Sequence, residues 1–437
     1  MFGTSGIRGT VGEDVTAGTA LSVGRALAAE GYDRVVVGRD PRESGAMLRD
    51  ALAAGLREGG SDVVDLGHAA TPTIARSVEW QKADAGVSIT ASHNPAPDNG
   101  LKLWAPSGQA FDEARREAIT ARVESERYDF ATWDRVGECE TYERADREHH
   151  NALVDAVSID DPPSVVVDVG NGAGGVTAGA LRELGCNVET LNADPDGSFP
   201  ARPSEPTAEN CETLQTVVAN SEAEVGIAHD GDADRMMAVT GEGEFVSGDV
   251  LLALFALQEA SKGQRVAVPV DTSLLVADAL DDVGASVTRT KVGDVYVAEE
   301  AVNEDVAFGG EPSGAWIWPE ETLCPDGPLA ACKLAALVSE RGALAEQIEE
   351  IDTYPIKRAN VEVPNAEKAT RMERIAERVR EEYDDVSAID GVRVGFEDGW
   401  ILVRASGTQP LIRLTAEARS EERAAELLET ARGLVEE

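Results

Sequence analysis

The sequence TASHNP at residues 90–95 follows the apolar run AGVSI at residues 85–89 and precedes DNGLK at residues 98–102. A buried strand that ends in small polar residues, proline and Asn-Gly presents its last residues at a strand end, where open α/β sheets bind their ligands. Ser92 lies at this tip and is a candidate nucleophile. Taken alone, the segment is more typical of a plain Ser-Asn-Pro turn, so other segments must decide its role.

His93 is the acid or base that stands next to Ser92 in the sequence. Because adjacent residues of a strand point to opposite sides, we expect His93 to be a poor partner base for a hydrolase triad.

The chain around this stretch alternates predicted strands and helices. Strands predicted at 34–37 and 62–66 are separated by a helix predicted at 44–59, and another helix opens at Thr71-Pro72. This alternation of strands and helices predicts a mostly parallel sheet with functional loops at one end. The polar, charged stretch at 138–150 is the expected linker to the next domain.

The rhythm continues beyond the linker, and a smaller last unit begins near residue 353. The fold class is therefore α/β, with further α/β units and a smaller α+β unit. The predicted domains are 1–145, 146–244, 245–352 and 353–437.

Composition limits the classes of function. The 437 residues carry 81 acidic and 39 basic side chains, a net charge of −42, which disfavours nucleic acid and anionic membranes as partners. No membrane span or targeting segment is seen, so we expect a cytoplasmic protein. The five scattered cysteines predict reduced structural thiols. The dispersed acidic charge resembles that of halophilic proteins in molar salt, with an ordinary acidic enzyme as the alternative.

The glycine-rich stretch FGTSGIRG at residues 2–9 holds a single arginine, Arg8. Such a loop lets backbone approach an anion and places one guanidinium on it. A second glycine-rich stretch, VVVDVGNGAGG at 165–175, has strand and helix around its turn. Its glycine spacing does not fit the dinucleotide-binding fingerprint, so nucleotide binding is disfavoured there.

The sequence DGDADR at residues 230–235 places Asp230, Asp232 and Asp234 at alternate positions between two apolar strands. Carboxylates in this pattern can converge on a hard cation such as Mg²⁺ and leave positions open for phosphate oxygens. An EF-hand is excluded because Gly241 stands where the loop needs its last glutamate. A solvated acidic turn is the alternative.

Two later loops carry candidate ligand groups. The loop GGEPSG at 309–314 offers Glu311 and Ser313 to sugar hydroxyls. The loop RASGTQP at 404–410, with Arg413 beyond it, combines two arginines, two hydroxyls and a glycine amide in a chain short of positive charge. This combination predicts a phosphate-binding loop, with a polar hairpin turn as the alternative.

Together the four motifs TASHNP, DGDADR, GEPSG and RASGT resemble those of the α-D-phosphohexomutase family, in the family's order and over nearly the whole chain. The resemblance implies four domains around a central cleft, three of them related mixed-sheet α/β units. It also implies an enzyme that moves a phosphoryl group between O6 and O1 of a hexose phosphate. The route passes through a phosphoserine and a 1,6-bisphosphate, which also serves as activator.

The resemblance assigns expected roles to residues. Ser92 would carry the phosphoryl group, and its phosphate with Asp230, Asp232 and Asp234 would bind Mg²⁺. Arg8 and Lys102 would stabilise charge or transfer protons, and His93 would orient its neighbours, with a structural histidine as the alternative. The expected substrate-binding residues are Arg235, Asp294, Glu311, Ser313, Arg404, Ser406, Gly407, Thr408 and Arg413.

Three departures from many relatives bear on the substrate. Ala315 and Gln409 replace a histidine and a glutamate, and Asp294 follows Gly293 where some phosphomannomutase/phosphoglucomutase enzymes have histidine. A carboxylate there favours an amino sugar, so we expect a phosphoglucosamine mutase activity. Phosphomannomutase/phosphoglucomutase activity, a phosphatase and a non-catalytic phosphosugar-binding paralogue are the alternatives. A sugar phosphate is the expected partner, and the protein is expected to be a monomer or homodimer.

Overall fold

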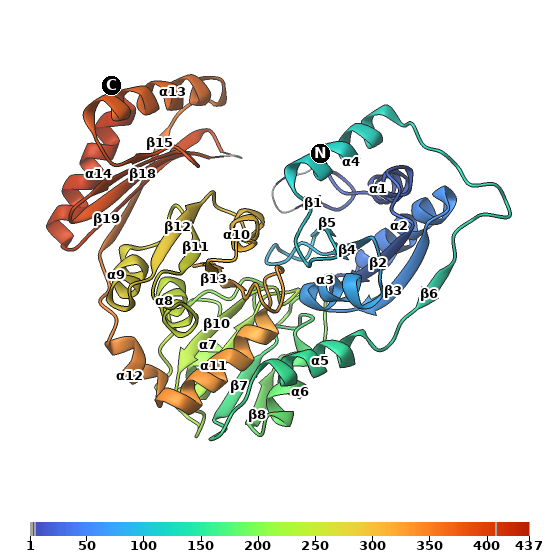
Figure 1. The fold of residues 1–437 in the computed structure, drawn as a ribbon, viewed down its shortest axis with the longest axis horizontal. Helices are drawn as coiled ribbons and strands as arrows, with labels where there is room; N and C mark the ends of the chain where they lie inside the picture. The colour runs from blue at the N-terminus through green and yellow to red at the C-terminus, as the bar shows by residue number, and fades with distance from the viewer. Residues whose placement is uncertain (1–2, 4–5, 407–408, 437) are drawn as a thin grey trace.

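The computed structural model describes residues 3, 6–406 and 409–436. Four sheets follow one another along the chain. In Figure 1 they lie along an arc, with the blue first sheet and the red last sheet at its two ends. No helix within the described residues is long and apolar enough to cross a membrane.

The first sheet has six strands in the order β1-β5-β4-β2-β3-β6. They are β1 (Ile7–Thr10), β2 (Arg34–Arg39), β3 (Asp62–His68), β4 (Ala85–Ile89), β5 (Asp98–Trp104) and β6 (Cys139–Thr141). The helices are α1 (Ala17–Ala29), α2 (Gly45–Gly59), α3 (Thr71–Trp80) and α4 (Glu113–Ser125). Strands β4, β2 and β3 are parallel and rich in buried valine, as expected for strands covered on both faces.

Three segments of this domain differ from the sequence predictions. Residues Ile7–Thr10, which begin within the glycine-rich stretch expected to be a loop, form a strand antiparallel to Asp98–Trp104, with Ile7 opposite Leu101. The supposed linker holds β6 and the first half of helix α5 (Ala145–Ala156), in which His149 is fully buried. The strands find their partners far away in the sequence, which local residue patterns do not reveal, whereas helix α5 was missed because most of its residues are polar or charged.

The second and third sheets are mixed, as predicted, with the orders β10-β9-β7-β8 and β12-β11-β13-β14. Each has one antiparallel edge strand, β10 or β14. The second contains β7 (Ser164–Asp168), β8 (Asn187–Leu191), β9 (Val225–His229) and β10 (Met236–Thr240), with helices α6 (Gly175–Glu183) and α7 (Glu212–Ala219). The third contains β11 (Arg265–Pro269), β12 (Ser286–Thr290), β13 (Val306–Glu311) and β14 (Ala315–Ile317). Its helices are α8 (Gly248–Glu259), α9 (Leu274–Val283), α10 (Asp294–Ala301), α11 (Gly327–Arg341) and α12 (Leu344–Glu349).

The last sheet is antiparallel throughout, in the order β15-β19-β18-β17-β16. Its strands are β15 (Ile356–Glu362), β16 (Val386–Ser387), β17 (Val392–Phe396), β18 (Gly399–Ala405) and β19 (Leu411–Ala418). Helices α13 (Asn365–Glu382) and α14 (Glu421–Glu436) pack against it around a core of their own. The predicted smaller α+β unit is therefore confirmed, while the domain boundaries drawn from the sequence stay predictions. All five cysteines are free, and all of them except Cys139 are buried.

A buried ion cluster joins three parts of the chain. Asp326 begins helix α11, where its Oδ1 accepts a hydrogen bond from the Leu329 amide. Its Oδ2 accepts a hydrogen bond from Nε of Arg76 on α3 at 2.8 Å and lies 3.1 Å from Nε2 of His149 on α5. Burial alone would raise the pKa of Asp326, but His149 and Arg76 hold it below its ordinary value.

We expect Asp326→Asn to lower the free energy of unfolding by about 3–5 kcal/mol at pH 7, because it leaves the Arg76 guanidinium buried without its counter-charge. The pKa of the Asp326 carboxyl is depressed in the folded protein. The stabilisation that its ionised form gives the wild type is therefore present above the ordinary pKa of 3.8 and is lost as the pH falls further. Thermal melts at neutral and acidic pH measure it. The exposed Asp160→Asn is the control, and an equal melting temperature for both variants at pH 7 would contradict the prediction.

Candidate active site

Ser92 lies in the turn between β4 and β5, where its φ of 49° is left-handed. The side chain is buried, and its Oγ donates a hydrogen bond to Oδ2 of Asp230 over 2.6 Å. The candidate nucleophile of the first domain and the candidate metal loop of the second therefore meet at one site.

His93 lies closer to Ser92 than expected, because its Nδ1 is 3.4 Å from the serine Oγ. The expectation assumed an extended strand, in which neighbours alternate, but the left-handed Ser92 turns the chain. Burial, with the charges of Arg235, Arg8 and Arg42, lowers the pKa of His93 to about 3. The imidazole is therefore neutral at physiological pH, and its orienting role stays a prediction.

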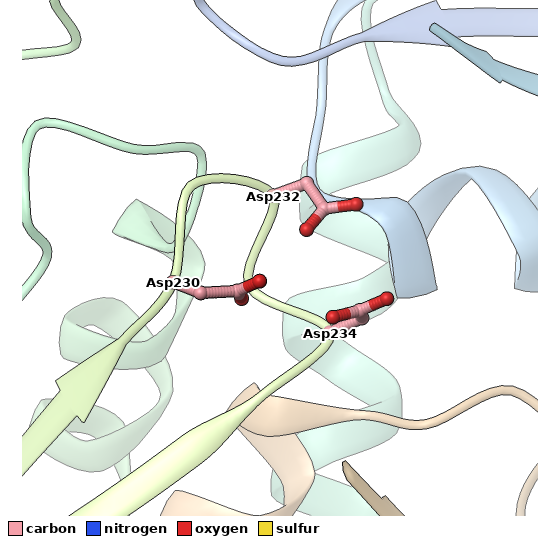
Figure 2. A group of neighbouring side chains, drawn as sticks. All are labelled: Asp230, Asp232 and Asp234. Atoms are coloured by element: carbon pink, nitrogen blue, oxygen red, sulfur yellow. The ribbon is translucent and has the colours of Figure 1, made fainter. Parts of the chain in front are cut away.

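The three aspartates Asp230, Asp232 and Asp234 follow strand β9 and are all buried. Figure 2 shows their carboxylates pointing into one shared space, and one oxygen of each lies within 4.8 Å of those of the other two. Burial and the neighbouring carboxylates raise the pKa of Asp234 to about 6 and raise that of Asp230 well above its ordinary value. The cluster thus concentrates negative charge that a cation would relieve.

The free oxygens of the cluster fit a hard divalent cation. Oδ2 of Asp232 accepts a hydrogen bond from the Thr71 hydroxyl at 2.6 Å, while Oδ1 of Asp232 and Oδ1 of Asp234 are buried without a hydrogen-bond partner. Buried acceptors without donors are costly, and carboxylate oxygens are the ligands that Mg²⁺ prefers. The three aspartates are the residues that would hold such an ion.

The two ends of the metal loop are fixed by His229 and Arg235. His229 is fully buried, and its Nδ1 lies 2.9 Å from the Arg235 carbonyl, while its Nε2 lies 2.9 Å from the Thr177 hydroxyl. The Arg235 amide donates to Oδ1 of Asp230 at 3.2 Å. The Arg235 guanidinium lies about 4 Å from both Asp234 and Glu205, so it adds positive charge beside the cluster.

Lys102 on β5 contacts residues of two other domains. Its Nζ donates to Oδ2 of Asp294 at 2.6 Å and lies 3.9 Å from Oδ2 of Asp234. Burial alone would lower the pKa of this ammonium, but the two carboxylates raise it above its ordinary value. The geometry favours a fixed positive charge over a proton acceptor, and it gives the Asp294 carboxylate a partner already within the chain.

Glu311 ends strand β13 and is buried, and its Oε1 accepts a hydrogen bond from the Gly293 amide at 2.8 Å. Burial, with the nearby Asp294, raises the pKa of Glu311 to about 7. Ser313 lies in the following turn and is exposed. Ser313 is therefore accessible from solvent, whereas the buried Glu311 is tied to the loop before α10 through Gly293.

We expect Glu311→Gln to stabilise the unliganded protein at pH 8 but not near pH 4.5. The folded pKa of about 7 exceeds the ordinary 4.5, so stability is lost as the pH rises between these values, by up to about 3 kcal/mol. Gln keeps an oxygen that can accept the hydrogen bond from the Gly293 amide, and it does not ionise as the pH rises. Thermal melts across this pH range measure the difference, with the exposed Glu304→Gln as control. A pH-independent difference would be evidence against a buried, titrating Glu311.

The predicted phosphate loop lies between β18 and β19. Arg404 and Arg413 stand opposite each other on these strands. Arg404 pairs with Asp390 at 3.0 Å, whereas Arg413 is exposed. The buried Ser406 accepts a hydrogen bond from the Gln409 amide at 3.1 Å. The predicted residues Gly407 and Thr408 lie outside the described residues.

Some residues of the site were not predicted from the sequence. Lys368 on α13 donates hydrogen bonds to the carbonyls of Ser406 and Gln409, which brings a third cation to the phosphate loop. Thr71 at the start of α3 holds Asp232 with both its hydroxyl and its amide. Neither belongs to a local motif.

The predicted Arg8 lies on β1, where its Nη1 is 3.5 Å from Oδ1 of Asn94 and its buried Nε has no hydrogen-bond partner.

These features define a four-sheet α/β protein in which a serine, a carboxylate cluster and several cations are drawn from different domains. Comparison with known families agrees. The phosphoglucomutase/phosphomannomutase alpha/beta/alpha domains I, II and III match residues 1–129, 147–243 and 247–354, and the C-terminal domain of that family matches 359–434. The chain therefore belongs to the α-D-phosphohexomutase family, and the predicted family and fold are confirmed.

Individual relatives match over almost their whole length. A probable phosphoglucosamine mutase from Methanopyrus kandleri is 47% identical over 433 residues, which cover 98% of this chain and 95% of the relative. One from Methanococcoides burtonii is 46% identical over 420 residues, which cover 96% and 95%. The crystal structure of a phosphoglucomutase/phosphomannomutase family protein from Burkholderia thailandensis is 28% identical with a TM-score of 0.88, covering 100% of this chain and 98% of that one. The relatives are mutases, in agreement with the predicted isomerase class.

Proposed function

We propose that this protein is a phosphoglucosamine mutase that interconverts glucosamine 6-phosphate and glucosamine 1-phosphate. The observation that carries the proposal is the 2.6 Å hydrogen bond between the Ser92 hydroxyl and Asp230, in a carboxylate cluster with unpartnered oxygens. A purely sugar-binding protein has no need of a buried hydroxyl in such a cluster. The names of the full-length relatives support the choice of glucosamine phosphate.

In the proposed reaction Ser92 carries a phosphoryl group. Its P–O bond to the serine breaks as a P–O bond to O1 of glucosamine 6-phosphate forms, and the proton of the sugar hydroxyl passes to the serine oxygen. The bisphosphate turns over in the site and returns its 6-phosphoryl group to Ser92. Added hexose 1,6-bisphosphate would act as activator by charging any enzyme that lacks this group.

The chain's own residues would bind and orient the reactants. Asp230, Asp232 and Asp234, with the phosphate on Ser92, would hold Mg²⁺, which when bound neutralises charge on the phosphoryl oxygens. Arg8 and Lys102 would supply fixed positive charge beside the transferred group.

The sugar and its distal phosphate would be held by the other two domains. Glu311, Ser313 and Asp294 would contact the sugar, and Asp294 would have to exchange its bond to Lys102 for a bond to the substrate's ammonium. Arg404, Ser406, Gly407, Thr408 and Arg413 would bind the distal phosphate, with Lys368 beside them.

The test compares three substrates in a coupled assay with Mg²⁺, molar salt and a trace of hexose 1,6-bisphosphate. We expect the highest kcat/KM with glucosamine 6-phosphate, relative to glucose 1-phosphate and mannose 1-phosphate. A preference for mannose or glucose phosphate would instead identify a phosphomannomutase/phosphoglucomutase. Release of inorganic phosphate without isomerisation would identify a phosphatase.

A further inference from the structure

One arginine outside the motifs described above holds the backbone of the serine loop, residues 90–98, which joins β4 to β5. Arg42 is fully buried, and its two terminal nitrogens donate hydrogen bonds to four carbonyl oxygens of that loop. The acceptors are Ser92 at 2.8 Å, Asn94 at 2.7 Å, Pro95 at 2.7 Å and Asp98 at 2.9 Å. One buried side chain thus binds four backbone carbonyls of the loop, which otherwise have few donors: only Pro95, through the Asp98 amide, and Ser92, through the Ser204 hydroxyl, accept a second hydrogen bond among the described residues.

A second chain of hydrogen bonds ties the same arginine to the amide of Ser92. Nε of Arg42 donates to Oδ2 of the buried Asp40 at 2.9 Å. The same oxygen accepts a hydrogen bond from the Thr90 hydroxyl at 2.7 Å, and the Thr90 hydroxyl accepts one from the Ser92 amide at 2.8 Å. Ser92 is therefore held at both its N–H and its C=O.

Holding Ser92 at both ends matters because its backbone is strained. A left-handed φ of 49° costs an L-residue roughly 1–2 kcal/mol, so the loop would relax if its partners were lost. Relaxation would move Oγ from its place 2.6 Å from Asp230, and Oγ is the reacting atom of the proposed function.

Residues 197–204 of the second domain contact both Arg42 and the serine loop. The Arg42 guanidinium lies 4.9 Å from the centre of the Phe199 ring, and the Ser204 hydroxyl donates to the Ser92 carbonyl at 2.8 Å. At Gly197 a Cβ atom would come within 2.4 Å of the Arg42 Cα, so only glycine allows this approach.

We propose that Arg42, with Asp40 and Thr90, is a positioning group that keeps Ser92 in its left-handed conformation and aims Oγ at the carboxylate cluster. The inference rests on the proposed function for its effect on catalysis. A lysine cannot replace the arginine, because a single ammonium on a flexible stem cannot span four carbonyls and a carboxylate as the planar guanidinium does.

The test compares the variants Arg42→Lys and Arg76→Lys with the wild type. Arg76 is the matched control because it too is buried, lies in the first domain and pairs with a buried aspartate, Asp326. Both variants should lower the melting temperature. We expect only Arg42→Lys to lower kcat with glucosamine 6-phosphate, by about 100-fold with little change in KM, because it displaces the reacting atom.

Hydrogen–deuterium exchange of the peptide spanning residues 90–99 gives a readout that does not depend on activity. We expect faster exchange in Arg42→Lys and unchanged exchange in Arg76→Lys. Thr90→Val removes the hydroxyl that links Ser92 to Asp40 and leaves the arginine, so it carries the test if Arg42→Lys does not fold. Its kcat should fall by about 10-fold.

The outcomes separate this inference from the proposed function. An active wild type together with an Arg42→Lys variant whose kcat and loop exchange match those of Arg76→Lys overturns the positioning role alone. A wild type that isomerises no sugar phosphate overturns the proposed function, and the exchange of residues 90–99 then still decides whether Arg42 holds the loop.

Discussion

Replacing Ser92 by alanine is expected to lower the rate of isomerisation by roughly 10⁴-fold or more, the size of effect seen when a nucleophile is removed from an enzyme. The variant lacks the oxygen that would carry the phosphoryl group, while the side chain it loses is small. Because Ser92 Oγ donates to Oδ2 of Asp230, its loss also removes the hydrogen bond to that oxygen, while Oδ1 keeps the Arg235 amide as donor. The coupled assay with glucosamine 6-phosphate measures the rate.

The control for this prediction is Ser125→Ala, an exposed serine at the end of α4 in the same domain. It should keep wild-type kcat. If Ser92→Ala retained more than about one hundredth of the wild-type rate, a phosphoserine route would be untenable, because residual catalysis by binding alone is far smaller.

Replacing Asp232 by asparagine is expected to have the second largest effect. Relative to the wild type, the variant should be more stable without metal and less stable with Mg²⁺. Without metal the variant should melt at a higher temperature than the wild type, because one of three clustered buried charges is gone and the amide can donate to Asp230 or Asp234. With Mg²⁺ the wild type should gain stability by binding the ion, and the variant should gain little.

Activity should follow metal binding. Loss of an outer partner of a metal ligand already costs 10–100-fold in affinity or activity, so loss of a direct ligand should cost about 100-fold or more at limiting Mg²⁺. Melting curves in chelator and in a Mg²⁺ series measure the first effect, and the coupled assay measures the second. The exposed Asp160→Asn is the matched control. A variant with wild-type response to Mg²⁺ would show that Asp232 is not a ligand.

The sequence predicts the parts of the site that lie within one short segment. Ser92 stands at a strand end, and the three aspartates alternate along one loop, so residue spacing alone brings each motif together. The α/β rhythm also follows from local periodicity. These are contacts between neighbours in the sequence, for which local patterns carry the information.

The rest of the site depends on contacts between distant segments. The bond between Lys102 and Asp294 joins residues 192 positions apart, and that between Ser92 and Asp230 joins residues 138 apart. Arg42 was absent from the predicted site because its partners are backbone carbonyls, which every residue offers equally. His93 was expected to point away because the left-handed turn at Ser92 has no signature in a non-glycine residue.

A label that passes from the enzyme to the sugar tests directly whether Ser92 carries the phosphoryl group. The protein is charged on Ser92 with a radiolabelled phosphoryl group from labelled hexose 1,6-bisphosphate, separated from excess label, and mixed with unlabelled glucosamine 6-phosphate and Mg²⁺. We expect the label to leave Ser92 and to appear on the sugar bisphosphate and then on glucosamine 1-phosphate, while Ser92 is phosphorylated again from the unlabelled sugar. Label that stays on the protein, or that is released only as inorganic phosphate, would contradict this expectation.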